Sequence, residues 1–152
     1  MVALFVDADA CPVKEEIVDV AHRHNLTVYM VSNSWMRLPD SPLVKRQVVP
    51  EGPDIADDWI ADEISANDIV ITGDIPLADR CIKKNAIALD SKGKQFTTQS
   101  IGMALAMRDL NNQLREQGVM TGGGAAFSRQ HRSRFLSELE NTIVRAVKNS
   151  RS

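Results

Sequence analysis

The chain has 152 residues, a net charge of −2 at pH 7 and a pI near 5.9. Residues 1–152 are enough for one domain with a full core, and the acidic balance excludes a strongly basic nucleic-acid binder without excluding a local basic patch. The sequence has no apolar run of membrane-spanning length, no secretion signal, and only two cysteines, Cys11 and Cys81, so we expect a soluble cytoplasmic protein.

The first half of the chain alternates between short apolar segments and helical patterns. Pro12 is expected in the first turn of a helix, where proline is favoured. The third apolar segment is polar enough to be a sheet edge. In chain order we predict a strand at 2–6, a helix at 12–24, a strand at 27–31, a loop at 32–43 that carries Trp35, and a strand at 44–49.

The second half continues the alternation and ends in helices. Thr97 or Thr98 is expected to cap a long helix that Gly118 stops. In chain order we predict a helix at 55–65, a buried strand at 68–72, a helix at 76–84, a strand at 86–90, a helix at 97–117, a Gly-rich connection at 121–126 and a helix at 132–148.

This pattern predicts a three-layer α/β/α fold, with a parallel sheet of about five strands and helices on both faces. The simplest strand order is 3-2-1-4-5, which places the first and fourth strands side by side at the switch point. Residues 119–152 would form a Gly-rich loop and an extra C-terminal helical extension.

Aspartates follow the two strands that this order makes neighbours. Asp7 and Asp9 follow the first strand, and Asp74 follows the fourth. Ligands of open parallel sheets bind beyond these carboxyl ends. Carboxylates at close range need a cation to stay ionised, and Mg²⁺ or Mn²⁺ prefers oxygen ligands. The sequence therefore predicts metal-assisted phosphate chemistry, with Asp7 as a primary ligand and Asp9 as a supporting group or helix cap.

A third ligand is predicted on the second helix. At about 100° per residue, Asp57 lies on the flank of the apolar stripe, whereas Asp54 and Asp58 lie nearly opposite it. We therefore predict that Asp7, Asp57 and Asp74 hold one or two ions, that Asp54 caps the helix and that Asp58 is solvated. The alternative is that these aspartates are only helix caps, since aspartate is favoured there.

Substrate contacts are predicted from the basic residues. Lys14 lies one turn into the first helix, Arg108 lies on the fourth, and Arg129 follows the Gly-rich stretch. Backbone N–H groups and arginines together can hold phosphate, although a flexible connection before a solvated helix explains the same pattern. The low aromatic content, 5%, weighs against a platform for stacking bases. Cys11 is expected to be a small buried residue, with a reactive thiol as the alternative.

Four segments together resemble one known family. The resemblance to the YaiI/YqxD (UPF0178) family runs from Met1 to about Leu139, and it implies a relation to the PIN-like and NYN nuclease folds, whose members bind Mg²⁺ or Mn²⁺ through strand-end aspartates and cut RNA. The matching segments are Asp7-Ala-Asp9-Ala-Cys-Pro-Val-Lys14, Asp54-Ile-Ala-Asp57-Asp58, Thr72-Gly-Asp74-Ile-Pro-Leu-Ala and Thr121-Gly-Gly-Gly.

Two further interpretations stay open. The Asp7-x-Asp9 and Gly73-Asp74-x4-Asp79 motifs resemble haloacid-dehalogenase phosphatases, in which Asp7 would be the phosphorylated nucleophile. Against this, Ala10-Cys11 follow Asp9, no phosphate-binding lysine is evident, and the chain lacks a cap domain. A non-catalytic module that binds metal or RNA is the third hypothesis.

Overall fold

The computed structural model describes residues 2–52, 54–116 and 127–150, with side chains described except at residue 10 and residues 108–116. Its sheet has the order β3-β2-β1-β4-β5-β6, so the predicted order of the first five strands is confirmed. These five run parallel, and β6 pairs antiparallel with β5. The strands are β1 (Ala3–Asp7), β2 (Thr27–Ser32), β3 (Val44–Val48), β4 (Ile69–Ile71), β5 (Ile87–Leu89) and β6 (Gln95–Phe96).

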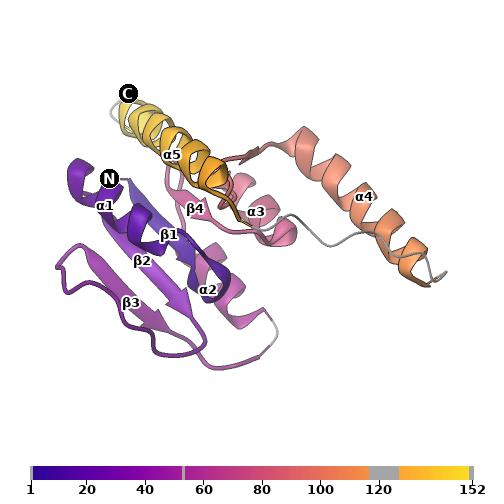
Figure 1. Ribbon diagram of the computed structural model, residues 1–152, viewed down its shortest axis with the longest axis horizontal. Helices are drawn as coiled ribbons and strands as arrows, with labels where there is room; N and C mark the ends of the chain where they lie inside the picture. The colour runs from indigo at the N-terminus through magenta and orange to yellow at the C-terminus, as the bar shows by residue number, and fades with distance from the viewer. Residues whose placement is uncertain (1, 53, 117–126, 151–152) are drawn as a thin grey trace.

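Helices cover both faces of the sheet, as predicted (Figure 1). One face packs against α1 and α5, and the other packs against α2 and α3, while α4 extends away from the sheet. The helices are α1 (Lys14–His24), α2 (Ile55–Glu63), α3 (Ile75–Ile82), α4 (Thr98–Glu116) and α5 (Arg129–Ser150), and a short 3-10 helix, η1, covers Ala8–Ala10. No helix in the described parts is long and apolar enough to cross a bilayer.

The alternation of β1 divides the core into two layers. Leu4 and Val6 point into the layer that α1 and α5 complete with residues such as Ile17 and Phe135. Phe5 points into the opposite layer, beneath α2 and α3. Because side chains alternate along a strand, Asp7 is directed to the same side as Phe5, toward α2 and α3. The side chain of Asp7, the last residue of β1, therefore lies on the same face of the sheet as α2, which carries Asp57.

Two predicted helix starts are wrong. The first helix begins at Lys14 and not at Pro12, because the chain first forms η1, and the carbonyl of Val13 accepts the first helical bond from Ile17 N at 3.0 Å. The last helix begins at Arg129 and not at residue 132. There Ser128 Oγ accepts from His131 N at 3.2 Å, which caps the helix three residues earlier.

The sequence prediction also missed β6, and several predicted elements are one or two residues too long. β6 is only two residues, Gln95–Phe96, which is too short to show a period. The second helix ends at Glu63 and not at Ser65, and β4 is limited to Ile69–Ile71. Asp68, predicted as the start of that strand, instead accepts bonds from Ala3 N and Ser65 N at 2.9 Å each and holds the amino ends of β1 and β4 together.

Candidate active site

The hydroxyl of Thr72 joins the carboxyl ends of the two central strands. Thr72 Oγ1 donates to Asp7 Oδ2 at 3.1 Å, and the same oxygen accepts from the backbone N–H of Asp74 at 3.0 Å. Thr72 is only 3% exposed, so water competes little for these bonds. The arrangement fixes the Asp7 carboxylate relative to the turn that leads into α3. Sequence analysis assigned Thr72 no role, although it stands inside the strand-end motif.

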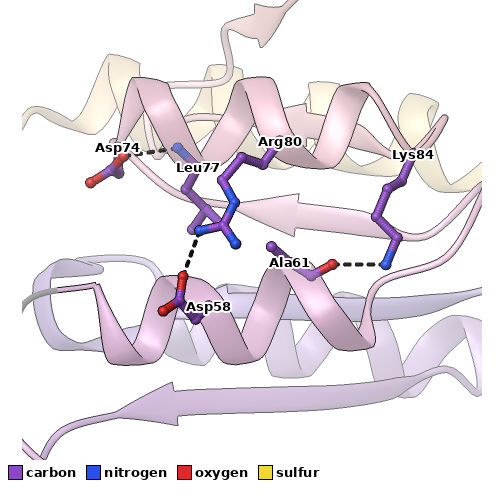
Figure 2. A network of polar contacts seen from close by, with 6 residues as sticks. All are labelled: Asp58, Ala61, Asp74, Leu77, Arg80 and Lys84. Atoms are coloured by element: carbon purple, nitrogen blue, oxygen red, sulfur yellow. Dashed lines mark hydrogen bonds and ion pairs between the residues drawn. The ribbon is translucent and has the colours of Figure 1, made fainter.

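Asp74 is the N-cap of α3. Its Oδ1 accepts from Leu77 N at 2.9 Å, and Pro76 occupies the first turn of the helix (Figure 2). The alternative that the aspartates serve as helix caps is therefore confirmed for Asp74. A cap uses one carboxylate oxygen, so it is compatible with a second role for the same side chain. An anion at a helix N-terminus is also stabilised by the helix dipole.

Asp57 completes a group of three carboxylates that influence one another. Burial raises the pKa of Asp57 to about 6, and the negative charges of Asp74, Asp7 and Asp54 and a hydrogen bond with Asp74 act in the same direction. Burial also raises the pKa of Asp7; the hydrogen bond from Thr72 lowers it, and the charges of Asp74 and Asp9 raise it. The structure thus brings Asp7, Asp57 and Asp74 together at the carboxyl edge of the sheet.

Two contacts join α2 to α3 and to the turn that follows α3 (Figure 2). Arg80 Nη1 forms an ion pair with Asp58 Oδ1 at 2.8 Å, and Lys84 Nζ donates to the carbonyl of Ala61 at 2.7 Å. Asp58 is exposed, as predicted, and its charge is used in pairing with Arg80. Asp57, the residue before Asp58, lies close enough to Asp74 and Asp7 for their charges to act on its carboxyl group.

Asp9 and Asp54 have other surroundings. Asp9 is exposed, and its Oδ2 accepts from Asn33 N at 2.9 Å, which ties η1 to the loop after β2. The predicted side-chain cap by Asp54 is wrong. Asp54 has φ 64°, in the left-handed region, and makes no side-chain capping bond; only its backbone carbonyl accepts, from Asp58 N at 2.8 Å. A capping side chain normally needs an extended backbone, which this residue lacks.

A small cleft of about 90 Å³ lies at the strand ends, beside Asp7. Thr72, Gly73 and Ser91 line it together with the buried Cys11. Burial raises the pKa of Cys11 to about 11, so the thiol stays protonated near neutral pH and the expected buried role of this residue is confirmed. Ser91 was missed by sequence analysis, because its approach to Asp7 arises only when β5 takes its place beside β4.

The predicted substrate-binding residues are scattered. Lys14 Nζ donates to the carbonyls of Cys11 at 3.0 Å and Ala8 at 3.4 Å, so it braces the turn after β1. Arg129 is exposed at the first residue of α5. The side chain of Arg108 and the Gly-rich segment at 121–124 lie outside the part of the chain that is described.

The donor set suits a small divalent ion that keeps much of its water. Within the described residues, no three histidine, cysteine, aspartate or glutamate side chains lie close enough to surround one ion together. The Asp57 and Asp74 carboxyls do approach within hydrogen-bonding reach of each other. Mg²⁺ is commonly held by one or two carboxylates plus waters and substrate phosphates. A pair of carboxylates backed by Asp7 fits that pattern.

Comparison with known proteins identifies relatives along almost the whole chain. The UPF0178 protein of Parvibaculum lavamentivorans is 62% identical over 143 residues, 94% of each chain. That of Rhodospirillum rubrum is 54% identical over 149 residues, covering 97% of this chain and 99% of the relative. No solved structure shows significant similarity. A family model described as "Uncharacterized BCR, YaiI/YqxD family" matches residues 5–145, and the chain belongs to this family.

Proposed function

We propose that this protein is a metal-dependent phosphodiesterase that cleaves nucleic acid, with RNA as the favoured substrate. The observation that carries the proposal is the meeting of Asp7, Asp57 and Asp74 at the switch point of a parallel sheet, where ligands of such sheets bind. Shifted carboxyl pKa values at such a site are typical of functional groups. Helix capping accounts for Asp74 but not for the inward position of Asp57.

Each residue has a separate task in this proposal. Asp57 and Asp74 hold Mg²⁺ or Mn²⁺, and Asp7, fixed by Thr72, lies beside them to orient the attacking water. Asp9 acts as a positioning residue through its bond to Asn33 N. When bound, a divalent ion stabilises negative charge on the phosphate oxygens and makes water more acidic.

Cleavage of labelled single-stranded RNA with and without Mn²⁺ tests the proposal. The wild type should cleave only with the ion, and Asp7→Asn should abolish cleavage. Asp62→Asn is the matched control, because Asp62 is an exposed residue of α2 and the chemical change is the same. Equal loss of cleavage in Asp62→Asn, or cleavage that persists in Asp7→Asn, would contradict the assigned roles.

The same protein distinguishes the other two hypotheses. A phosphatase of the haloacid-dehalogenase type forms an aspartyl-phosphate, so beryllofluoride would inhibit it and a small phosphate ester would label Asp7. Our proposal predicts neither effect. Binding of Mn²⁺ or RNA without turnover in either assay would favour the non-catalytic module. We also propose that the protein is cytoplasmic, which the free thiols of Cys11 and Cys81 support.

A further inference from the structure

A tryptophan on the loop after β2 has no role in the core. Trp35 is 66% exposed, whereas Trp59 packs against Phe5 and Tyr29 with ring centroids 6.1 and 5.9 Å apart. The aromatic content of 5% is too low for a surface of several rings, but we infer that Trp35 alone is a stacking platform for one unpaired nucleobase and that it binds a single strand at the carboxyl edge of the sheet. This inference rests on the proposed function for its purpose, but it concerns binding and is tested separately from cleavage.

The ring is held in place before any ligand arrives. The Arg46 guanidinium lies over it, 4.9 Å from the ring centroid, and Arg46 Nε donates to the carbonyl of Met36 at 3.1 Å. Before Trp35 in the chain, Ser32 Oγ donates to the carbonyl of Ser34 at 2.7 Å, which orders the backbone that leads to the ring. An isolated exposed aromatic residue is ordinary, but a ring that already packs against a guanidinium on an ordered backbone loses less entropy on binding.

The loop is also tied to the edge that carries the carboxylates. Asn33, two residues before Trp35, donates its N–H to Asp9, two residues after Asp7. Because β1 and β2 are parallel with Asp7 opposite Val31, Trp35 follows β2 at the same edge of the sheet where Asp7 ends β1. Arg46 is paired with Met30, whose side chain lies in the layer beneath α1 and α5, so the ring lies toward that face and a strand that also reaches the carboxylates must pass over the edge.

Positive charge lies next to the ring, where a phosphate backbone would need it. A cleft of about 440 Å³ is lined by Arg37 and Lys14 together with Glu15, Leu38 and Pro39. Single-stranded nucleic acid is bound by aromatic rings that stack on bases and by cations that follow the backbone. Trp35 with Arg46 and Arg37 provides both within one loop and its neighbouring strand. A protein partner would be expected to use a wider apolar patch than one ring among arginines.

The test measures binding of a labelled single-stranded oligothymidylate by fluorescence anisotropy in EDTA, so that cleavage plays no part. Trp35→Ala should weaken binding by about fivefold or more, as expected from the loss of one base–aromatic contact, and Trp35→Phe should retain most of the affinity. Val48→Ala is the matched control, since Val48 is another exposed apolar side chain and should leave affinity unchanged. In a Trp59→Phe background, the remaining Trp35 fluorescence should be quenched by the oligonucleotide and not by the same sequence as a duplex.

The outcomes separate this inference from the proposed function. Binding that is equal in Trp35→Ala and the wild type, or no binding by the wild type, would overturn the inference. Binding that needs Trp35 without RNA cleavage in Mn²⁺ would support it and overturn the proposed activity. If Trp35→Ala cleaves RNA and binds the oligonucleotide as well as the wild type does, the proposed activity would stand and the inference about Trp35 would be overturned. Equal quenching by single strand and duplex would also contradict stacking on an unpaired base.

Discussion

Thr72 Oγ1 lies 3.1 Å from Asp7 Oδ2 and donates to it, so a neutral hydroxyl supports this half-buried carboxylate. The same hydroxyl accepts from Asp74 N. One side chain therefore couples the end of β1 to the start of α3. The relation explains how the sheet can hold two carboxylates near each other in the described structure without a basic side chain bonded to Asp7.

Thr72→Val removes this coupling with little change in shape. The half-buried Asp7 carboxylate loses its donor and Asp74 N loses its acceptor, so we expect the free energy of unfolding to fall by about 1–3 kcal/mol. Urea denaturation at pH 7 measures this loss. Thr72→Ser keeps the hydroxyl and should lose clearly less. Equal losses in the two variants would show that the methyl group, and not the hydroxyl, matters.

Asp57 should make stability depend on pH. Its pKa is raised from 3.8 to about 6 in the folded protein, so the folded state holds this proton more tightly than the unfolded chain. The resulting stabilisation is fully present below pH 3.8 and is lost as pH rises through about 6. Asp57→Asn should therefore melt at a higher temperature than the wild type at pH 7.5, without metal, and this advantage should shrink toward pH 4.

Thermal melts across this pH range, with Asp62→Asn as the control on the same helix, measure the effect. The melting temperature of Asp62→Asn should match that of the wild type at each pH, because Asp62 is exposed. A pH-independent difference between Asp57→Asn and the wild type would mean that ionisation of the partly buried Asp57, beside its neighbouring charges, is not the cause.

The sheet order could be derived from the sequence because right-handed crossovers leave few arrangements for five alternating strands. The inward position of Asp57 also followed from helical periodicity. Other features depend on contacts between distant segments. The bridge from Thr72 to Asp7 exists only when β1 and β4 pair, and β6 forms only because β5 is available beside it. Asp54 has a left-handed backbone and makes no side-chain capping bond, although aspartate is favoured as a cap.

The two cysteines should be unreactive in the native protein. Burial raises the pKa of both Cys11 and Cys81 to about 11, so almost no thiolate is present at pH 7.5. A thiol reagent such as dithionitrobenzoate should therefore react slowly with the folded protein and rapidly in denaturant. Fast labelling of Cys11 in the native state, seen in the wild type and lost in Cys11→Ser, would support the alternative of a reactive Cys11.

Asp74 allows the cap and the charge to be separated. Asparagine caps helices about as well as aspartate, so Asp74→Asn should keep the bond to Leu77 N and should not lower the melting temperature of the metal-free protein. Asp74→Ala loses the cap, and its free energy of unfolding should be lower by about 1 kcal/mol.

If Asp74 holds the ion, millimolar Mn²⁺ should raise the melting temperature of the wild type and of Asp62→Asn. It should not raise that of either Asp74 variant, because only ligands bound to the folded state stabilise it. Differential scanning fluorimetry with and without Mn²⁺ makes the comparison. A wild-type melting temperature that does not change with Mn²⁺, or an undiminished gain in Asp74→Asn, would contradict a metal site at this carboxylate.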